Sequence, residues 1–281
     1  MIYDSIVIGA GPAGVVAALQ MKRAGLNVVL FESGELGGLL RNANFIENYL
    51  GFPDGVSGRE LVRHFQDHLC KYKVPLLKEE VLEIGREDKI FSVHTSEHMY
   101  RGATIVVATG TVPKKAGIEG EEQLGESKLF YEVADLPEDE QKKSVVVIGG
   151  GDAAFDYALN LSSKWHASTI VTRGTVSCLP ILKERVEKEG IPYLENSLVL
   201  RICKAGSQLE VQCETDTFKA DYVLIAVGRE PRYPRIATKN KEGLYFVGDV
   251  RGGRYRQVHI ATGDALRVAM EISHSLLTTQ S

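Results

Sequence analysis

Two glycine-rich turns, each directly after a short apolar run, constrain this sequence more than any other feature. The turns are residues 9–14, GAGPAG, and residues 149–154, GGGDAA. The apolar runs at residues 6–8 and 145–148 are typical of buried parallel strands, which are covered on both faces. A helix-length stretch and a second apolar strand follow each turn. This order of strand, turn, helix and strand predicts a right-handed crossover feeding a parallel sheet, and the chain contains it twice.

The glycines of the first turn have separate roles in a phosphate site. Gly9 allows a sharp bend, Gly11 lets the backbone approach a pyrophosphate, and Gly14 lets helix and strand pack closely. The N-terminus of the following helix offers free N–H groups and the positive end of its dipole. Glu32, 18 residues after Gly14 at the end of the second strand, is placed to bind ribose hydroxyls. The turn therefore predicts a dinucleotide site, the alternative being a plain helix-capping loop.

The second turn differs at the end of its second strand. Gly149 and Gly151 are kept, and Ala154 stands in the packing position, which the fingerprint allows. The strand then runs into Arg173, with no Asp or Glu to hold a free 2′-hydroxyl. An arginine accommodates a 2′-phosphate, so this position favours NADP over NAD. The alternative is that Arg173 is a solvated surface side chain.

The order of the elements predicts an α/β fold with two Rossmann-like, three-layer nucleotide-binding domains. A last strand at 244–247 and a last helix from about 258 have no nucleotide-binding turn of their own, so we place them back in the first domain. Proline-marked connections then divide the chain. The first domain is split in sequence, as residues 1–112 plus 237–281, and residues 113–236 are inserted as the second.

Composition excludes several classes of protein. The 281 residues carry 33 Lys and Arg against 37 Asp and Glu, and 44% are hydrophobic. These values are close to globular averages, so the bulk of the chain is not disordered. There is no basic run to neutralise phosphates, so we expect no nucleic-acid partner. The first apolar run is broken by Asp4 and by glycines, so we expect no signal peptide, no membrane association and a cytoplasmic location.

The four cysteines are scattered and form no CxxC motif or other metal-ligand pattern. They are Cys70, Cys178, Cys203 and Cys213. This usage fits reduced, mostly buried thiols of a cytosolic protein. We expect no metal site.

The motifs together resemble the low-molecular-weight thioredoxin reductases and their flavoprotein relatives. They occur in the same order across nearly the whole chain: 9–14 with Glu32, Gly37-Gly38, 47–53, 108–110, 149–154, 226–229, 248–249 and 255–257. The resemblance implies FAD extended across the first domain, NADPH or NADH on the second, and a homodimer. It also implies hydride transfer from nicotinamide C4 to flavin N5.

The resemblance assigns roles to individual residues. Asp249 would contact the ribityl chain, the backbone of Gln257 and Val258 would face the flavin pyrimidine, and Glu32 would hold the adenosine ribose. A helix N-terminus suits the pyrimidine because reduction places negative charge there. The residues implied for FAD are Gly9, Gly11, Pro12, Ala13, Gly14, Glu32, Gly37, Gly38, Leu39, Asn48, Ala108, Thr109, Gly110, Gly248, Asp249, Gln257 and Val258. Those implied for NAD(P)H are Gly149, Gly151, Asp152, Ala153, Ala154, Arg173, Gly228 and Arg229.

The departure from the family lies at the dithiol. Thioredoxin reductases carry a CxxC shortly before the second turn, and Glu132 and Asp135 stand in its place here. Carboxylates cannot exchange with a disulfide, so we do not expect thioredoxin reduction by the family mechanism. The two acids either solvate a polar loop, or one of them moves a proton over the flavin with a pKa raised by burial. His259 has the same two interpretations, a catalytic proton donor or a structural histidine.

The sequence thus predicts an FAD-dependent oxidoreductase that takes electrons from NAD(P)H and passes them from flavin to an acceptor without a protein dithiol. The acceptor would be ferredoxin or flavodoxin, as in ferredoxin–NADP reductase relatives that lack CxxC, or a quinone or other small molecule. The alternative is a non-catalytic flavin or nucleotide sensor or a subunit of a redox complex. That alternative would explain why the site has no thiols and why Arg173 is the only basic residue where the family has a basic cluster for NADPH.

Overall fold

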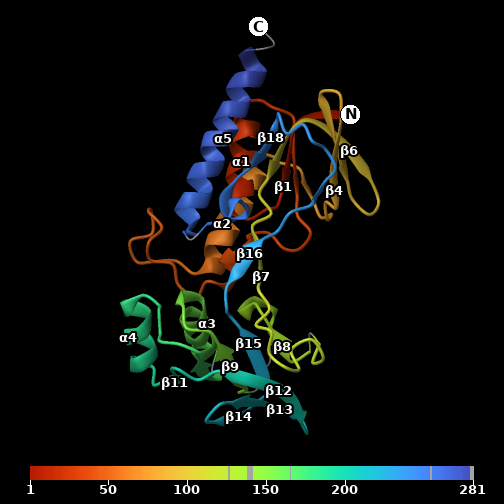
Figure 1. The fold of residues 1–281 in the computed structure, drawn as a ribbon. Helices are drawn as coiled ribbons and strands as arrows, with labels where there is room; N and C mark the ends of the chain where they lie inside the picture. Colours follow the sequence, from red (N-terminus) through yellow and green to blue (C-terminus); the bar gives the residue numbers. More distant parts are fainter. Residues whose placement is uncertain (126, 138–141, 165, 254, 279–281) are drawn as a thin grey trace. The chain divides into compact units, whose positions relative to one another are not determined.

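The chain forms two compact units in a computed structural model that describes residues 1–125, 127–137, 142–164, 166–253 and 255–278 (Figure 1). Unit 1 comprises Met1–Arg41, Phe45–Val112 and Glu230–Ser281, and unit 2 comprises Asn42–Asn44 and Pro113–Arg229. The return to unit 1 thus lies between Arg229 and Glu230, a few residues before the position expected from the prolines. The short segment Asn42–Asn44 belongs to unit 2 although the sequence on both sides of it belongs to unit 1.

Unit 1 is built on an eight-stranded sheet of order β17-β4-β5-β6-β1-β2-β3, with β18 also paired to β6. The pairs β18–β6, β6–β1 and β1–β2 are parallel, whereas β4, β5 and β6 form an antiparallel meander. The strands are β1 (Ile2–Ile8), β2 (Val28–Phe31), β3 (Leu76–Leu77), β4 (Glu83–Glu87), β5 (Ile90–His94), β6 (Met99–Val107), β17 (Arg235–Ile236) and β18 (Leu244–Phe246).

Apolar strands and small helical residues explain this packing. All four residues of β2 are buried, as expected for a strand covered on both faces. Helix α1 (Pro12–Arg23) packs on α5 (Val258–Thr278), and its buried face is rich in small residues such as Ala17 and Ala18. Helix α2 (Gly58–Lys71) also belongs to this unit. Leu244 of β18 lies opposite Ile105 of β6, so the last strand does return to the first sheet, as predicted.

Unit 2 has three layers. A parallel sheet of order β11-β10-β9-β15-β8 forms the middle, and a separate antiparallel sheet of order β12-β13-β14 packs on one side of it. Helices α3 (Asp152–Ser163) and α4 (Pro180–Lys188) pack on the other side. The strands are β8 (Leu129–Phe130), β9 (Ser144–Ile148), β10 (Ala167–Val171), β11 (Tyr193–Leu194), β12 (Val199–Ala205), β13 (Gln208–Cys213), β14 (Thr217–Ala220) and β15 (Tyr222–Ile225). The predicted α/β class and nucleotide-binding architecture are confirmed.

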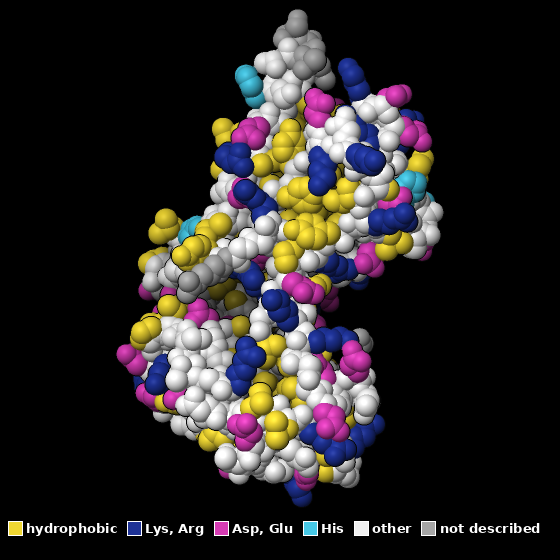
Figure 2. Space-filling model, in the orientation of Figure 1, with side chains coloured by type: hydrophobic (Ala, Val, Ile, Leu, Met, Phe, Trp, Pro, Cys, Tyr) yellow, Lys and Arg dark blue, Asp and Glu magenta, His cyan; other side chains and the backbone are white. Residues whose placement is uncertain are grey.

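Short irregular elements complete the chain. They are the strands β7 (Thr111–Pro113) and β16 (Arg229–Pro231), which pair with each other, and the 3₁₀ turns η1 (Gly38–Asn42), η2 (Val133–Asp135) and η3 (Gly248–Arg251). None of the helices in the described part of the chain is long and apolar enough to span a membrane. In the face seen in Figure 2, Lys and Arg side chains are interspersed with Asp and Glu, so this face carries no basic patch.

The thiols are less buried than the sequence suggests. Cys213 is buried, Cys178 and Cys203 are half-buried, and Cys70 is exposed. Helix α2 buries Leu61, Phe65 and Leu69, and the next residue, Cys70, is turned away from that face by about 100°. The expectation of mostly buried thiols is therefore wrong.

Candidate functional site

The first glycine turn has the geometry of a phosphate-binding loop. Gly9 has φ +101°, and a Cβ there would lie 2.5 Å from the carbonyl oxygen of Ala108. A Cβ on Gly14 would lie 1.7 Å from the carbonyl oxygen of Gly9, so strand and helix meet closely. At Gly11 a Cβ would meet no atom within 4 Å. Two glycines therefore serve the fold, and the third leaves open backbone for a ligand.

Two further glycine segments gather at the start of α1. A Cβ on Gly38 would lie 3.4 Å from the Cα of Gly11, and one on Gly248 would lie 2.9 Å from the Cβ of Ala13. The Gly248 N–H donates to Asp264 at 3.0 Å, which fixes the turn that carries Asp249. Segments that are more than 200 residues apart in the sequence thus meet at one helix N-terminus.

The two helices that follow the glycine turns, α1 and α3, differ from α2 in how their N-termini are capped. Helix α2 is capped by Ser57, whose hydroxyl accepts from the Glu60 N–H at 3.1 Å. The N-cap residues of α1 and α3 are Gly11 and Gly151, and neither helix has a side-chain cap. The first N–H groups of both helices are therefore available to an anion such as a pyrophosphate.

The Glu32 carboxylate is held at the end of β2 beside the first turn. One oxygen accepts from the Ala10 N–H at 2.7 Å and the other from the Gly34 N–H at 2.9 Å. A carboxylate has about four acceptor positions, so capacity remains for ribose hydroxyls.

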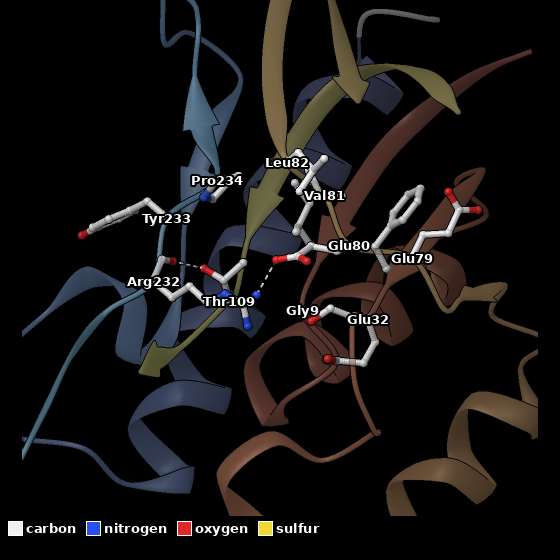
Figure 3. A pocket seen from close by; sticks show the side chains of 13 residues that line it. Gly9, Glu32, Glu79, Glu80, Val81, Leu82, Thr109, Arg232, Tyr233 and Pro234 are labelled. Atoms are coloured by element: carbon white, nitrogen blue, oxygen red, sulfur yellow. Dashed lines mark hydrogen bonds and ion pairs between the residues drawn. The ribbon is translucent and has the colours of Figure 1, made fainter. Parts of the chain in front are cut away.

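A pocket opens beside Glu32 (Figure 3). The residues that line it opposite Glu32, among them Glu80 and Arg232, were not foreseen from the sequence. Arg232 and Glu80 form an ion pair of 2.5 Å, and the Thr109 hydroxyl donates to the Arg232 carbonyl. Figure 3 shows Tyr233 pointing away from this pair, where its hydroxyl donates to the Val250 carbonyl at 2.7 Å. The pocket is lined by Ile8, Gly9, Phe31, Glu32, Ser33, Glu79, Glu80, Val81, Leu82, Thr109, Arg232, Tyr233 and Pro234. Its position between the turn and Glu32 suits the adenosine end of a dinucleotide.

The start of α5 is tied to the loop at residues 48–50. Asn48 donates to the Gln257 side chain at 3.2 Å. The His259 Nε2 atom lies 3.0 Å from the Asn48 carbonyl and 3.4 Å from the Leu50 N–H nitrogen. The Tyr49 ring stacks on the His259 ring with centroids 4.8 Å apart. The structure thus brings the predicted residues Asn48, Gln257 and His259 together, and it gives His259 partners within the loop.

The second glycine turn repeats the geometry of the first in unit 2. Gly149 has φ +151°, and a Cβ there would lie 2.4 Å from the carbonyl oxygen of Ala226. At Gly151 the nearest atom would be 4.0 Å away. Asp152 begins α3 and accepts from the Leu179 N–H at 2.8 Å. Arg173 is exposed. The turn can hold a second dinucleotide by its backbone.

Glu132 lies in a half-buried polar cluster of unit 2. One of its carboxylate oxygens pairs with Arg229 at 2.5 Å. The other accepts from the Asn42 amide at 2.5 Å and from the Tyr157 hydroxyl at 3.0 Å. Asp135, by contrast, is exposed. The partners Asn42 and Tyr157 were not foreseen, since neither belongs to a motif.

The half-buried Asp156 holds the neighbouring chain segment with its carboxylate. It accepts from the Asn44 N–H at 3.1 Å. Burial raises the pKa of Asp156 to about 6. The Asn160 amide donates to the Asn42 carbonyl at 3.2 Å, and the Asn42 side-chain oxygen accepts from the Ala134 N–H at 3.0 Å. Helix α3 and η2 thus bind Asn42–Asn44 to unit 2.

Comparison with known proteins agrees with this geometry. The sequence model of a family described as pyridine nucleotide-disulphide oxidoreductase matches residues 3–265. The thioredoxin reductase of Bacillus subtilis (strain 168) is 30% identical over 301 residues, which cover 97% of this chain and 94% of that protein. The thioredoxin reductase of Treponema pallidum (strain Nichols) is 30% identical over 306 residues, 99% of each. The crystal structure of Lactococcus lactis thioredoxin reductase (FR conformation) superimposes with a TM-score of 0.87 at 26% identity, and 98% of this chain and 99% of that one are covered.

Proposed function

This chain belongs to the pyridine nucleotide-disulphide oxidoreductase family, and we propose that it carries electrons from NAD(P)H through FAD to an external acceptor without a dithiol of its own. It is a flavin oxidoreductase by its family, and the family uses FAD and a pyridine nucleotide. The electron acceptor and the path to it are the parts that are proposed here.

The residues of unit 1 fit FAD. The open backbone at Gly11 and the uncapped start of α1 would bind the pyrophosphate, and Glu32 would accept from the ribose hydroxyls. Asp249, on the turn next to α1, would meet the ribityl chain. The bound flavin would supply a carrier that accepts two electrons and returns them singly or in pairs. In unit 2, the turn at Gly151 and the start of α3 would hold the pyridine nucleotide.

The observation that carries the proposal is the environment of Glu132. At the position expected for the first thiol, the structure has a carboxylate bound by Arg229, Asn42 and Tyr157. A carboxylate held in this way accepts hydrogen bonds but cannot carry an electron pair to a disulfide. Asp135, at the second position, is an exposed acid.

The remaining thiols do not replace the pair. All four are free. In the antiparallel sheet of unit 2, Cys213 lies opposite Val199 and Cys203 lies opposite Glu210, so these two cysteines are not cross-strand partners. Electrons would therefore leave the flavin directly for ferredoxin, flavodoxin, a quinone or another small acceptor, and not for thioredoxin.

We infer a positioning role for Glu132. Its three partners hold a charged carboxylate between η2, Asn42 and the start of β16, and this favours the structural over the proton-carrying interpretation. His259, in unit 1, stays a candidate proton donor to the flavin, and the proton-carrying role of Asp135 stays a prediction from the sequence. A cytoplasmic homodimer is part of the same proposal.

Anaerobic titration of the FAD-loaded protein tests the function. NADPH or NADH should bleach the flavin absorbance near about 450 nm. The reduced protein should then be reoxidised by ferricyanide or ferredoxin but not by oxidised thioredoxin. If neither nucleotide bleaches the flavin, the proposal that NAD(P)H reduces this protein is wrong, and the alternative of a flavin or nucleotide sensor or a redox-complex subunit is favoured. Rapid reoxidation by thioredoxin would instead refute the dithiol-free path.

A further inference from the structure

The chain segment that carries Arg173 follows β10, and the segment that runs beside it in the structure follows β11, the next strand of the unit 2 sheet. Strands β10 and β11 run parallel, with Val171 opposite Leu194, so both end at the same edge of the sheet. Beyond them, the Asn196 N–H donates to the Gly174 carbonyl at 3.1 Å. The segment that follows β11 thus runs beside the segment that carries Arg173.

Glu195 reaches from that neighbouring segment into the loop after β10. Its Oε1 atom accepts from the Val176 N–H at 2.5 Å. The next residue, Ser177, donates its N–H to the carbonyl of Gly150 at 2.8 Å. Two consecutive residues therefore anchor this loop: Val176 bonds to Glu195, and Ser177 bonds to the glycine turn. The Glu195 carboxylate is thereby connected to the phosphate-binding turn through these two consecutive residues of the loop.

We propose that Glu195 binds the ribose 2′-hydroxyl of the pyridine nucleotide and makes the second site select NADH over NADPH. The dinucleotide fold normally takes this carboxylate from the end of its second strand, which here has Arg173. Glu195 supplies the same group from the adjacent strand. The hydrogen bond from Val176 uses one of about four acceptor positions, so the carboxylate can still accept from a hydroxyl. The inference rests on the proposed function, because it requires a pyridine nucleotide at this turn.

Charge and hydrogen bonding both disfavour a 2′-phosphate here. The Val176 N–H is a donor that a phosphate oxygen could use, and it is already bound to an anion. Asp152 adds a second carboxylate, bound to the Leu179 N–H of the same loop. Residues 172–178 contain a single cationic residue, Arg173, which is exposed and so is screened by water. Glu195 and Asp152 are exposed as well, and Lys183 lies within electrostatic reach of Glu195, but each carboxylate is oriented by a backbone N–H of this loop. A dianionic phosphate would meet these two oriented carboxylates, whereas a hydroxyl would find an acceptor.

The test compares NAD⁺ with NADP⁺ and uses FAD-loaded protein throughout. Isothermal titration should show NAD⁺ binding about tenfold more tightly, since like charges in contact discriminate strongly. Glu195→Gln keeps an acceptor for Val176 and removes the charge, so it should tighten NADP⁺ binding and reduce the preference by about tenfold. Glu189→Gln removes the same charge from the exposed C-terminal end of α4 and should leave the ratio unchanged.

The outcomes separate this inference from the proposed function. Tighter binding of NADP⁺ to the unaltered protein, or an unchanged ratio in Glu195→Gln, would overturn the inference while the oxidoreductase function stands. Failure of both nucleotides to bind would overturn the proposed function and the inference together. Flavin absorbance and thermal unfolding of each variant show that the fold and the FAD site are retained, so an altered ratio reports the nucleotide site.

Discussion

The carboxylate of Glu132 lies 2.5 Å from the guanidinium of Arg229, and each side chain keeps only 16% of its surface exposed. Removing two charges from water to this extent is costly, and only their attraction and their hydrogen bonds to partners offset that cost. The same carboxylate accepts from Asn42 and Tyr157, so one residue ties η2 to α3, to the start of β16 and to Asn42. Glu132 therefore joins several segments of unit 2, at the position where the family's first thiol is expected from the sequence.

Removing this carboxylate should destabilise the protein. Glu132→Ala removes the carboxylate that pairs with Arg229 and accepts from Asn42 and Tyr157, and we expect a loss of about 2–4 kcal/mol in the free energy of unfolding. Urea unfolding measures it. Glu230→Ala removes an exposed acid from the next position and should change stability by less than about 0.5 kcal/mol. Equal effects of the two substitutions would show that the cluster contributes nothing.

The proton-carrying interpretation of Glu132 has a different signature. Glu132→Gln keeps the shape of the side chain and one acceptor but cannot transfer a proton. If Glu132 only positions its neighbours, the pH–rate profile of flavin reduction should keep the same rising and falling limbs in Glu132→Gln as in the unaltered protein, even if the rate changes. A limb that moves or disappears in the pH–rate profile would assign the proton to Glu132.

The glycines of the first turn should separate ligand binding from folding. Gly14→Ala places a methyl group 1.7 Å from the Gly9 carbonyl oxygen and should prevent unit 1 from folding. Gly11→Ala meets no atom within 4 Å, so the protein should fold while the methyl group faces the pyrophosphate. We expect Gly11→Ala to lower FAD affinity by about tenfold or more with unchanged stability of the apoprotein. FAD retention and apoprotein melting curves check this, and full FAD affinity in Gly11→Ala would argue against a pyrophosphate at this turn.

Local patterns made the fold and the two turns predictable, and tertiary pairing set the rest. The strand, turn and helix around Gly9 and Gly149 are contiguous in sequence, so their geometry follows from the glycine spacing. Glu195 escaped notice because its strand β11 becomes the neighbour of β10 only in the folded sheet. Asn42 gave no signal either, since its partners Glu132 and Asn160 lie about 90 and 118 residues away. The apolar runs in the sequence could not show that one face of the parallel sheet in unit 2 is covered by a second sheet and not by helices.

Asp156 should make stability depend on pH. Its pKa rises to about 6 in the folded protein through burial, from 3.8, so the folded state binds more protons than the unfolded state between these values. Stability then falls as pH rises through this window. Asp156→Asn removes the half-buried charge and keeps an acceptor for the Asn44 N–H. We expect it to raise the free energy of unfolding by about 1–3 kcal/mol at pH 7.5, with the gain vanishing toward about pH 4.

Unfolding curves at both pH values measure the effect of Asp156→Asn. Asp135→Asn is the control, because it removes a carboxylate that is exposed in the same unit. A gain that is the same at both pH values would contradict a raised pKa at Asp156.

A cysteine-free variant tests the dithiol-free path most directly. Cys70, Cys178 and Cys203 would be replaced by serine and the buried Cys213 by alanine, and the FAD-loaded variant would be assayed for NADH- or NADPH-driven reduction of ferricyanide or ferredoxin. We expect kcat to stay within about twofold of the unaltered protein, because no thiol lies on the electron path. A variant that binds FAD and is reduced by the nucleotide, yet no longer passes electrons to the acceptor, would contradict the account.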